Sequence, residues 1–265
     1  MSRVSDYRAE LCSLPDWEPY LLGHSGLPGP RGNLELAHAV AEEGTEEQFR
    51  RWSALSPDVA PENTPEAFLA FCGVMGLGAL LGRRGEASSA DAGTPEWPTH
   101  GGAAQGGDTP PLRILRALAS DPRWRIREAV ATGLQLWGDS DMPALLQEMV
   151  EWVGGGYYEQ RAAAAALCEP RLLKDPGQVA TVLELLDRIT QGIASAPPAD
   201  RKSEPFRTLR QGLGYCWSVA VAARPAEGVP LMQRWLAHPD LDVRWIMREN
   251  LKKKRIASLN ISSPE

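Results

Sequence analysis

The sequence predicts an all-α protein, and three observations lead to that prediction. Apolar residues recur with the helical period of about 3.6 residues along most of the 265-residue chain. No segment alternates convincingly with the period of two that a half-buried strand requires. The surroundings of four arginines also repeat along the C-terminal part of the chain, as in proteins built from stacked helices.

Residues typical of helix starts precede several of the apolar segments. Thr64 stands before Pro65, so that a capping hydroxyl is followed by a proline at the first helical position. Thr45 and Gln48 have the spacing of a capping box. The expected helices span Val4–Leu14, Pro15–Gly23, Asn33–Glu43, Thr45–Leu55, Pro65–Leu81, Pro111–Ser120, Pro122–Trp137, Met142–Val153, Tyr157–Cys168, Gly177–Gly192, Ser203–Gly212, Leu213–Ala223, Pro225–His238 and Leu241–Ile256.

One segment departs from this pattern. Residues 83–110 are rich in Gly, Ala, Ser, Thr and Pro, and Trp97 is their single large apolar side chain. A segment of this length with so little to bury is expected to be a disordered insertion. It separates N-terminal helical repeats, residues 1–82, from C-terminal repeats, residues 111–257. Residues 258–265 are expected to form a flexible tail.

The cellular compartment follows from three further features. The apolar stretch Ala67–Leu81 is shorter than the roughly 20 residues that span a bilayer, which favours a buried core helix. The first residues have interleaved charges and no apolar segment, so no secretory signal is expected. Cys12, Cys72, Cys168 and Cys216 lie far apart without a C-x-x-C pair. We therefore expect a reduced, cytoplasmic protein with no membrane partner.

The repeat is centred on Arg127, Arg161, Arg210 and Arg244. Apolar residues stand three and seven positions after each arginine, which places one buried stripe on each helix. A preceding helix repeats in the same register before three of the four. The arginines are 34, 49 and 34 residues apart. Such intervals are typical of stacked helix pairs, in which no pair covers its own apolar face.

Two of these segments resemble HEAT repeats. Residues 118–134 read LASDPRWRIREAVATGL, and residues 235–251 read WLAHPDLDVRWIMRENL. HEAT repeats have an Asp or Pro in the turn, followed by Val or Ile and then Arg at the start of the second helix. The resemblance implies a right-handed α-solenoid of about six stacked antiparallel helix pairs with a concave inner surface.

The repeated arginines have two interpretations. The HEAT resemblance implies an internal ladder, in which each arginine pairs with a turn carboxylate of the same or the adjacent repeat. Asp121 would then pair with Arg127. Asp240 or Asp242 would pair with Arg244. In the alternative interpretation the arginines contact a binding partner.

The last predicted helix is basic, although the whole chain has a formal charge of −6. Arg244, Arg248, Lys252 and Arg255 recur on one helical face. Residues 240–255 contain six basic and three acidic residues. Two interpretations stay open. The strip binds nucleic-acid phosphates, or its cations gather at a helix C-terminus, where the macrodipole favours them, and cap the solenoid.

The nine tryptophans also have two interpretations. Trp152, Trp217 and Trp235 fall at core positions of the repeat, where large rings fill space between helix layers. Trp124 and Trp245 do not, and they are the better candidates for a surface that stacks on a base or packs on a partner.

Catalytic and cofactor motifs are absent from the sequence. It contains no H-E-x-x-H, P-loop, G-x-S-x-G or strand-associated G-x-G-x-x-G pattern. Glu35-x-x-His38 is half of a di-iron motif whose second half is missing. We therefore expect no cofactor and no metal.

The sequence thus favours a non-catalytic HEAT-like scaffold that binds a protein or peptide on its concave face. The alternative is a DNA-binding protein that resembles HEAT-like DNA alkylation repair proteins in architecture; if an enzyme, it would have a glycosylase-like activity. A different small enzyme on the same scaffold is a third hypothesis. The candidate partner-binding residues are Arg123, Trp124, Arg127, Tyr157, Arg161, Arg210, Arg244, Trp245, Arg248, Lys252 and Arg255.

Overall fold

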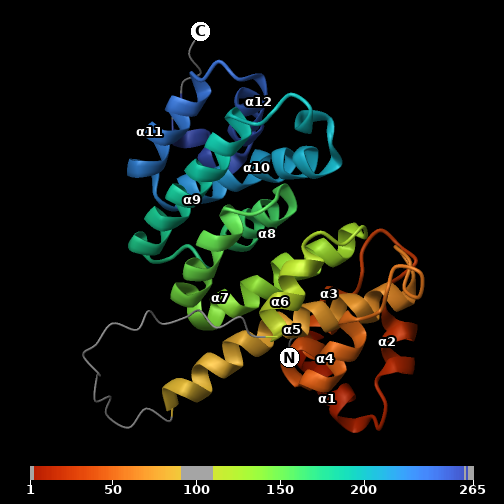
Figure 1. Cartoon of the computed structure of the whole chain (residues 1–265). Coiled ribbons are helices and arrows are strands. Elements are labelled where there is room, and N and C mark those ends of the chain that lie inside the picture. Colours follow the sequence, from red (N-terminus) through yellow and green to blue (C-terminus); the bar gives the residue numbers. More distant parts are fainter. Residues whose placement is uncertain (1–2, 91–109, 260, 262–265) are drawn as a thin grey trace, which may run out of the picture. The chain divides into compact units, whose positions relative to one another are not determined.

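The computed structural model describes residues 3–90, 110–259 and 261, and every regular element in these residues is a helix (Figure 1). The all-α prediction is therefore confirmed for this part of the chain. The α-helices are α1 (Arg3–Ser13), α2 (Glu18–His24), α3 (Leu34–Glu43), α4 (Glu46–Ser53), α5 (Pro65–Ala90), α6 (Pro110–Leu118), α7 (Trp124–Val153), α8 (Tyr157–Leu167), α9 (Pro176–Ala194), α10 (Glu204–Ala223), α11 (Pro225–Leu236) and α12 (Leu241–Leu251). Two short 3-10 helices, η1 (Asp200–Lys202) and η2 (Lys254–Leu259), follow α9 and α12.

The chain folds as two compact units, residues 1–141 (unit 1) and 142–265 (unit 2). The sequence predicts a division at residues 83–110, most of which lie outside the described residues. The boundary lies within α7, where the backbone of Asp141 is not helical (φ −146°, ψ 77°) and Pro143 follows. Because proline has no N–H to continue the hydrogen-bond ladder, the break agrees with the prediction of separate helices on either side of it.

Unit 1 is built around α5. The stretch Pro65–Arg83 has a mean hydropathy of 1.6 and is 78% buried, and it is the one described segment apolar and long enough to cross a membrane. It contacts α2, α3, α4 and α6, while α1 packs on α3. Phe68, Cys72 and Met75 on α5 are almost completely buried. The segment is thus the core helix that the sequence predicts.

Two glycines bring α5 and α7 unusually close together. A Cβ added to Gly78 would lie 2.2 Å from backbone atoms of Gly133, and a Cβ on Gly133 would lie 3.2 Å from the carbonyl oxygens of Val74 and Met75. No other residue type leaves room for this approach. The N-terminal half of α7 therefore packs on the central helix of unit 1 backbone against backbone.

Unit 2 consists of helices in two layers. Tyr157 on α8 packs edge-on against Phe206 on α10, with ring centroids 5.5 Å apart, and further along the Sγ of Cys216 donates to the Ala164 carbonyl oxygen at 3.5 Å. The order of these contacts shows that α8 and α10 run in the same direction.

The same relation joins α10 to α12. The Arg210 Nε lies 2.8 Å from the Asp242 carboxylate, and two turns on the Ser218 backbone N–H donates to the Asn250 Oδ1 at 2.7 Å. Helices α9 and α11 each contact α10 and α12. In the sequence α9 lies between α8 and α10, and α11 lies between α10 and α12. Unit 2 is thus a series of helix pairs whose second members, α8, α10 and α12, lie side by side.

Some predicted helices differ from the structure by more than a few residues at an end. Helix α5 continues to Ala90, into the predicted insertion, and residues 91–109 of that segment lie outside the described residues. The predicted helices Ser203–Gly212 and Leu213–Ala223 are one helix, α10. The glycines near the expected break do not interrupt it, because Leu209, Leu213 and Trp217 form one buried face across them.

The last predicted helix, Leu241–Ile256, ends early. Helix α12 stops at Leu251 with Lys252 as its C-cap, and η2 follows. Of the predicted flexible tail, Ser258 and Leu259 belong to η2, while residues 260 and 262–265 lie outside the described residues.

Replacing Gly78 by alanine is expected to lower the free energy of unfolding by about 1–3 kcal/mol, because the new Cβ meets backbone rather than a movable side chain. Urea denaturation followed by circular dichroism measures the change. Gly23→Ala is the matched control, since nothing lies within 4 Å of a Cβ at that position on α2. If the two variants unfold at the same urea concentration, the close approach of α5 and α7 does not exist in solution.

Candidate functional site

A pocket of about 260 Å³ opens on unit 1 beside the first turns of α7. Its apolar lining comes from three separate segments. Leu27 and Leu34 belong to the α2–α3 connection and the start of α3, Phe68 and Phe71 to α5, and Trp124 to α7. Arg31, Arg125 and Glu128 add polar groups to the same pocket. The pocket is therefore apolar inside and carries charge around its lining.

The α2–α3 connection is held in shape by hydrogen bonds within unit 1. Gly26 has a positive φ of 73°, a backbone conformation that glycine adopts without strain. Asn33 caps α3 by accepting from the Leu36 N–H at 3.1 Å, and its amide donates to the His24 carbonyl oxygen at 3.0 Å. Ser25 is buried, and its carbonyl oxygen accepts from the Asn33 N–H at 2.9 Å. This wall of the pocket is preformed.

Arg125 joins this connection to the α4–α5 connection. Its guanidinium donates to the Gly29 carbonyl oxygen at 2.7 Å and to the Asn63 Oδ1 at 3.0 Å, and it lies 3.4 Å from the Glu62 carboxylate. The Asn63 Oδ1 also accepts from the Gly29 N–H at 3.0 Å. The Arg125 side chain is 9% exposed. It is a buried cation whose hydrogen bonds fix two loops against α7.

Arg123 and Arg127, both candidate partner contacts, also point inward. The Arg123 guanidinium forms an ion pair with Asp121 at 2.8 Å and donates to the Ala60 carbonyl oxygen at 3.0 Å. Arg127 donates to the backbone oxygens of Asp121 and Pro122 at 2.7 and 3.1 Å. Both residues are more than nine-tenths buried. They support the fold, and neither guanidinium is presented to a partner.

The predicted ladder is present here in an altered form. Arg127 does bond to Asp121, but to its backbone oxygen, while Arg123 takes the Asp121 carboxylate. The sequence could not separate the two arginines because both stand close to the same turn.

In the sequence Trp124 lies between Arg123 and Arg125, and its side chain faces outward. It is 50% exposed, one of the most exposed large apolar side chains among the described residues. The guanidinium carbon of Arg125 lies 4.4 Å from the centre of its ring. A cation at this distance from an indole face is attracted by the ring electrons. Trp124, a surface candidate from the sequence, therefore forms an exposed and well-supported edge of the pocket.

Four other candidates lie in unit 2, along α8, α10 and α12. Tyr157 donates to the Asp200 carboxylate at 2.9 Å, and burial together with this hydrogen bond raises the pKa of its hydroxyl. The side chain of Arg161 lies beside Gly212 of α10. Arg210 pairs with Asp242 and stacks on Trp245 with its guanidinium carbon 3.9 Å from the ring centre. The structure brings Arg210 and Trp245 together as one packed pair.

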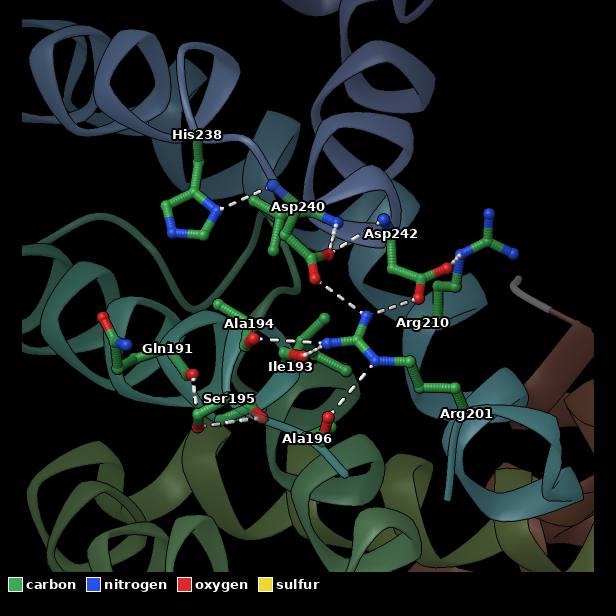
Figure 2. A network of polar contacts seen from close by, with 12 residues as sticks. Gln191, Ile193, Ala194, Ser195, Ala196, Arg201, Arg210, His238, Asp240 and Asp242 are labelled. Atoms are coloured by element: carbon green, nitrogen blue, oxygen red, sulfur yellow. Dashed lines mark hydrogen bonds and ion pairs between the residues drawn. The ribbon is translucent and has the colours of Figure 1, made fainter. Parts of the chain in front are cut away.

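The sequence did not single out the arginine at the centre of unit 2. Figure 2 shows Arg201 between Asp240 and Asp242, each at 2.8 Å, and the carbonyl oxygens of Ile193, Ala194 and Ala196 at 3.2 Å. Burial lowers the pKa of Arg201. The Asp240 and Asp242 carboxylates together raise this pKa by more, so the net shift is upward. Arg201 lies between the predicted helices Gly177–Gly192 and Ser203–Gly212, where no repeat pattern marks it.

The predicted pairing of Asp240 or Asp242 with Arg244 is therefore wrong. Both carboxylates are held by Arg201, and Asp242 also by Arg210 (Figure 2). The arginine–carboxylate pair therefore joins Arg210 on α10 to Asp242 at the start of α12, in the next repeat, and does not lie within one repeat.

The remaining candidates lie at the end of unit 2. Arg248, Lys252 and Arg255 are exposed and Arg244 is partly buried. Lys252 pairs with Glu249 at 2.5 Å. Because α12 ends at Leu251, Arg255 leaves the helical face on which the sequence placed it. It lies against α10 instead, where it donates to the Tyr215 hydroxyl oxygen at 2.6 Å.

The walls contributed by unit 1 loops were missed by sequence reasoning. The turn Gly29-Pro30-Arg31-Gly32 was the available signal, but nothing in it indicates that it meets α7 some ninety residues later.

Among the described residues, no three His, Cys, Asp or Glu side chains gather where they could hold a metal ion.

Comparison with known proteins yields no family. No protein-family model matches the chain, and no curated protein matches it in sequence. Among solved structures, it is similar to a designed armadillo repeat protein with 14% sequence identity and a TM-score of 0.31, over 88% of this chain and 98% of that one. The helices themselves, rather than so distant a likeness, define the fold.

Replacing Arg123 by methionine is expected to lower the free energy of unfolding by about 3 kcal/mol or more, because it leaves the Asp121 carboxylate buried without its cation. Urea denaturation measures this loss. Arg31→Met is the control, since its pair with Glu35 is exposed, and exposed pairs contribute at most about 1 kcal/mol. An Arg123 variant as stable as the control would show that the ion pair is not buried in solution.

Proposed function

We propose that this protein is a non-catalytic helical-repeat scaffold that binds a segment of a partner protein and seats one large apolar side chain in the pocket beside Trp124. The observation that carries the proposal is the preformed apolar pocket with an exposed tryptophan at its edge. Most of the energy of a protein interface comes from a few aromatic or apolar anchors that fill such pockets.

The size of the pocket favours a side chain over a whole small molecule. Its volume of about 260 Å³ is below the range of roughly 300–1,000 Å³ usual for small-molecule sites. A single aromatic or branched aliphatic side chain is the natural occupant. The apolar walls supply the binding energy, while Arg31 and Glu128 contribute polar contacts to the flanking peptide.

Rigidity of the pocket supports the same function. Arg125 connects the two loops and α7 through bonds to Gly29 and Asn63, so little conformational entropy is lost when a partner binds. The sequence contains none of the catalytic motifs considered above, and for this reason we favour a scaffold over an enzyme.

The proposal extends to the architecture that the HEAT resemblance implies: a right-handed solenoid of about six helix pairs, with the partner along its inner concave face. Support comes from the side-by-side α8, α10 and α12 of unit 2, since stacked repeats align their second helices in this way. The alternative of DNA binding through the repeat openings has less support, because Arg123 and Arg127 bond within the chain.

Selection of random displayed peptides on the full-length protein tests this function. The wild type is expected to enrich peptides with a recurrent aromatic or aliphatic anchor. Trp124→Ala should weaken the selected peptides by at least about tenfold, as loss of an interface anchor does. Tyr215→Ala is the matched control, since it removes another exposed aromatic outside the pocket.

A pocket-filling variant separates the cavity from the tryptophan. A Cβ at Gly32 would make ordinary contact with Phe68 at 3.5 Å, so Gly32→Leu places a side chain in the pocket without removing any group. It is expected to abolish peptide binding while the thermal midpoint stays near that of the wild type. Isothermal titration with a selected peptide measures the affinity. If peptides bind the filled variant as tightly as the wild type, the pocket is not the binding site.

A further inference from the structure

A second surface, on unit 2, is strongly basic and does not belong to the pocket. It consists of the consecutive residues Lys252, Lys253, Lys254 and Arg255, of which Lys253 and Arg255 lie over the ring of Tyr215 on α10; we call it the basic surface. Residues 248–259 contain five basic residues and one acidic residue, in a chain whose net charge is −6. Charge of this sign concentrated at one end of a unit is the electrostatic footprint of a polyanion site.

The cations of the basic surface are ordered by packing. Ile256 of η2 is 3% exposed, and its N–H donates to the Lys253 carbonyl oxygen at 3.2 Å, which fixes the turn that presents Lys254 and Arg255. Arg255 donates to the Tyr215 hydroxyl oxygen at 2.6 Å, and its guanidinium carbon lies 4.6 Å from the ring centre. The Lys253 ammonium lies 5.8 Å from the same ring. Preorganised charges bind an anion at a lower entropic cost.

Nearby acidic residues do little to neutralise this surface. Asp240 and Asp242, at the opposite end of α12, are occupied by Arg201 and Arg210 (Figure 2). Glu249 pairs with Lys252. Within residues 3–90, 110–259 and 261, no ion pair of Lys253, Lys254 or Arg255 with a carboxylate is present. These three cations keep their charge for a ligand.

The exposed ring of Tyr215 indicates which polyanion fits. Tyr215 is 44% exposed, unlike most large aromatic side chains among the described residues. Cations interleaved with an exposed aromatic are the combination that binds single-stranded nucleic acid, since the cations contact phosphates and the ring stacks on an unpaired base. A duplex keeps its bases stacked inside, and an acidic peptide has no base to place on the ring.

We propose that the basic surface around Tyr215 is a binding site for single-stranded nucleic acid, contacted through its phosphates by Lys253, Lys254 and Arg255 and through one base by Tyr215. The site is independent of the pocket beside Trp124. Its affinity is dominated by the phosphate contacts and therefore carries no strong sequence preference.

Fluorescence anisotropy with a labelled oligothymidine and the full-length protein tests this inference. At low salt, about 50 mM, binding is expected, and the logarithm of the affinity should fall with the logarithm of salt at about −0.7 per phosphate contact. The triple variant Lys253→Gln, Lys254→Gln, Arg255→Gln should weaken binding by at least about tenfold. Tyr215→Ala should weaken it by about tenfold through lost stacking.

Matched controls keep the test specific. The triple variant Lys174→Gln, Arg188→Gln, Lys202→Gln removes two lysines and one arginine from exposed positions elsewhere in unit 2 and should bind as the wild type does. Trp124→Ala should also leave oligothymidine binding unchanged, which separates this site from the proposed peptide pocket. Circular dichroism verifies that each variant is folded.

Three results would overturn the inference. The first is no binding of oligothymidine at low salt. The second is tighter binding to a duplex of mixed sequence, or equal loss in the two triple variants, which would indicate non-specific attraction. The third is tighter binding to labelled polyglutamate than to oligothymidine, which would assign the surface to an acidic protein.

Discussion

Arg123 and Arg125 carry positive charge into unit 1 at the start of α7. The neighbouring Asp121 carboxylate compensates it, together with the Glu62 carboxylate and carbonyl oxygens from distant segments. A buried charge without such partners costs several kcal/mol. The loops that supply Ala60 and Gly29 therefore have one favourable arrangement around α7, although neither loop has regular structure of its own. Trp124, between the two arginines, is held at the surface for the same reason.

Unit 2 uses a comparable device between helix layers. Arg201 satisfies carbonyl oxygens at the end of α9 and two carboxylates at the start of α12, so one side chain closes two helix termini (Figure 2). Helix ends leave their last carbonyls without intrahelical partners, and this cation occupies them. Apolar faces bring the layers together, and the arginine fixes their register.

Local signals in the sequence were sufficient to find most helices. The Thr45–Gln48 capping box is present, and the buried stripe of α12 includes Val243 and Met247 as its spacing predicts. Tertiary contacts explain what local signals did not indicate: α10 continues through Gly212, beside Arg161 of α8, and through Gly214, beside Trp245 and Glu249 of α12. Helix α5 also continues to Ala90, where composition indicated an insertion.

The candidate site was less accessible to prediction. Trp124 was identified because it falls outside the buried stripe, a property that the sequence contains directly. The direction in which a neighbouring arginine side chain points depends on distant acceptors. Arg123, for example, donates to the carbonyl oxygen of Ala60, more than sixty residues away. No pattern within the sequence of α7 indicates where these acceptors lie. The sequence therefore did not distinguish the arginines that are buried from those that are exposed.

The ladder of unit 2 has a direction. Arg210 of α10 meets Asp242 at the start of α12, the next layer. Arg244 holds the equivalent repeat position on α12 and forms no ion pair with a carboxylate among the described residues. If a helix pair from the middle of the series stood at its end, no following pair would supply the carboxylate that neutralises its arginine. The net charge that a helix pair exposes therefore depends on its position in the series as well as on its own residues.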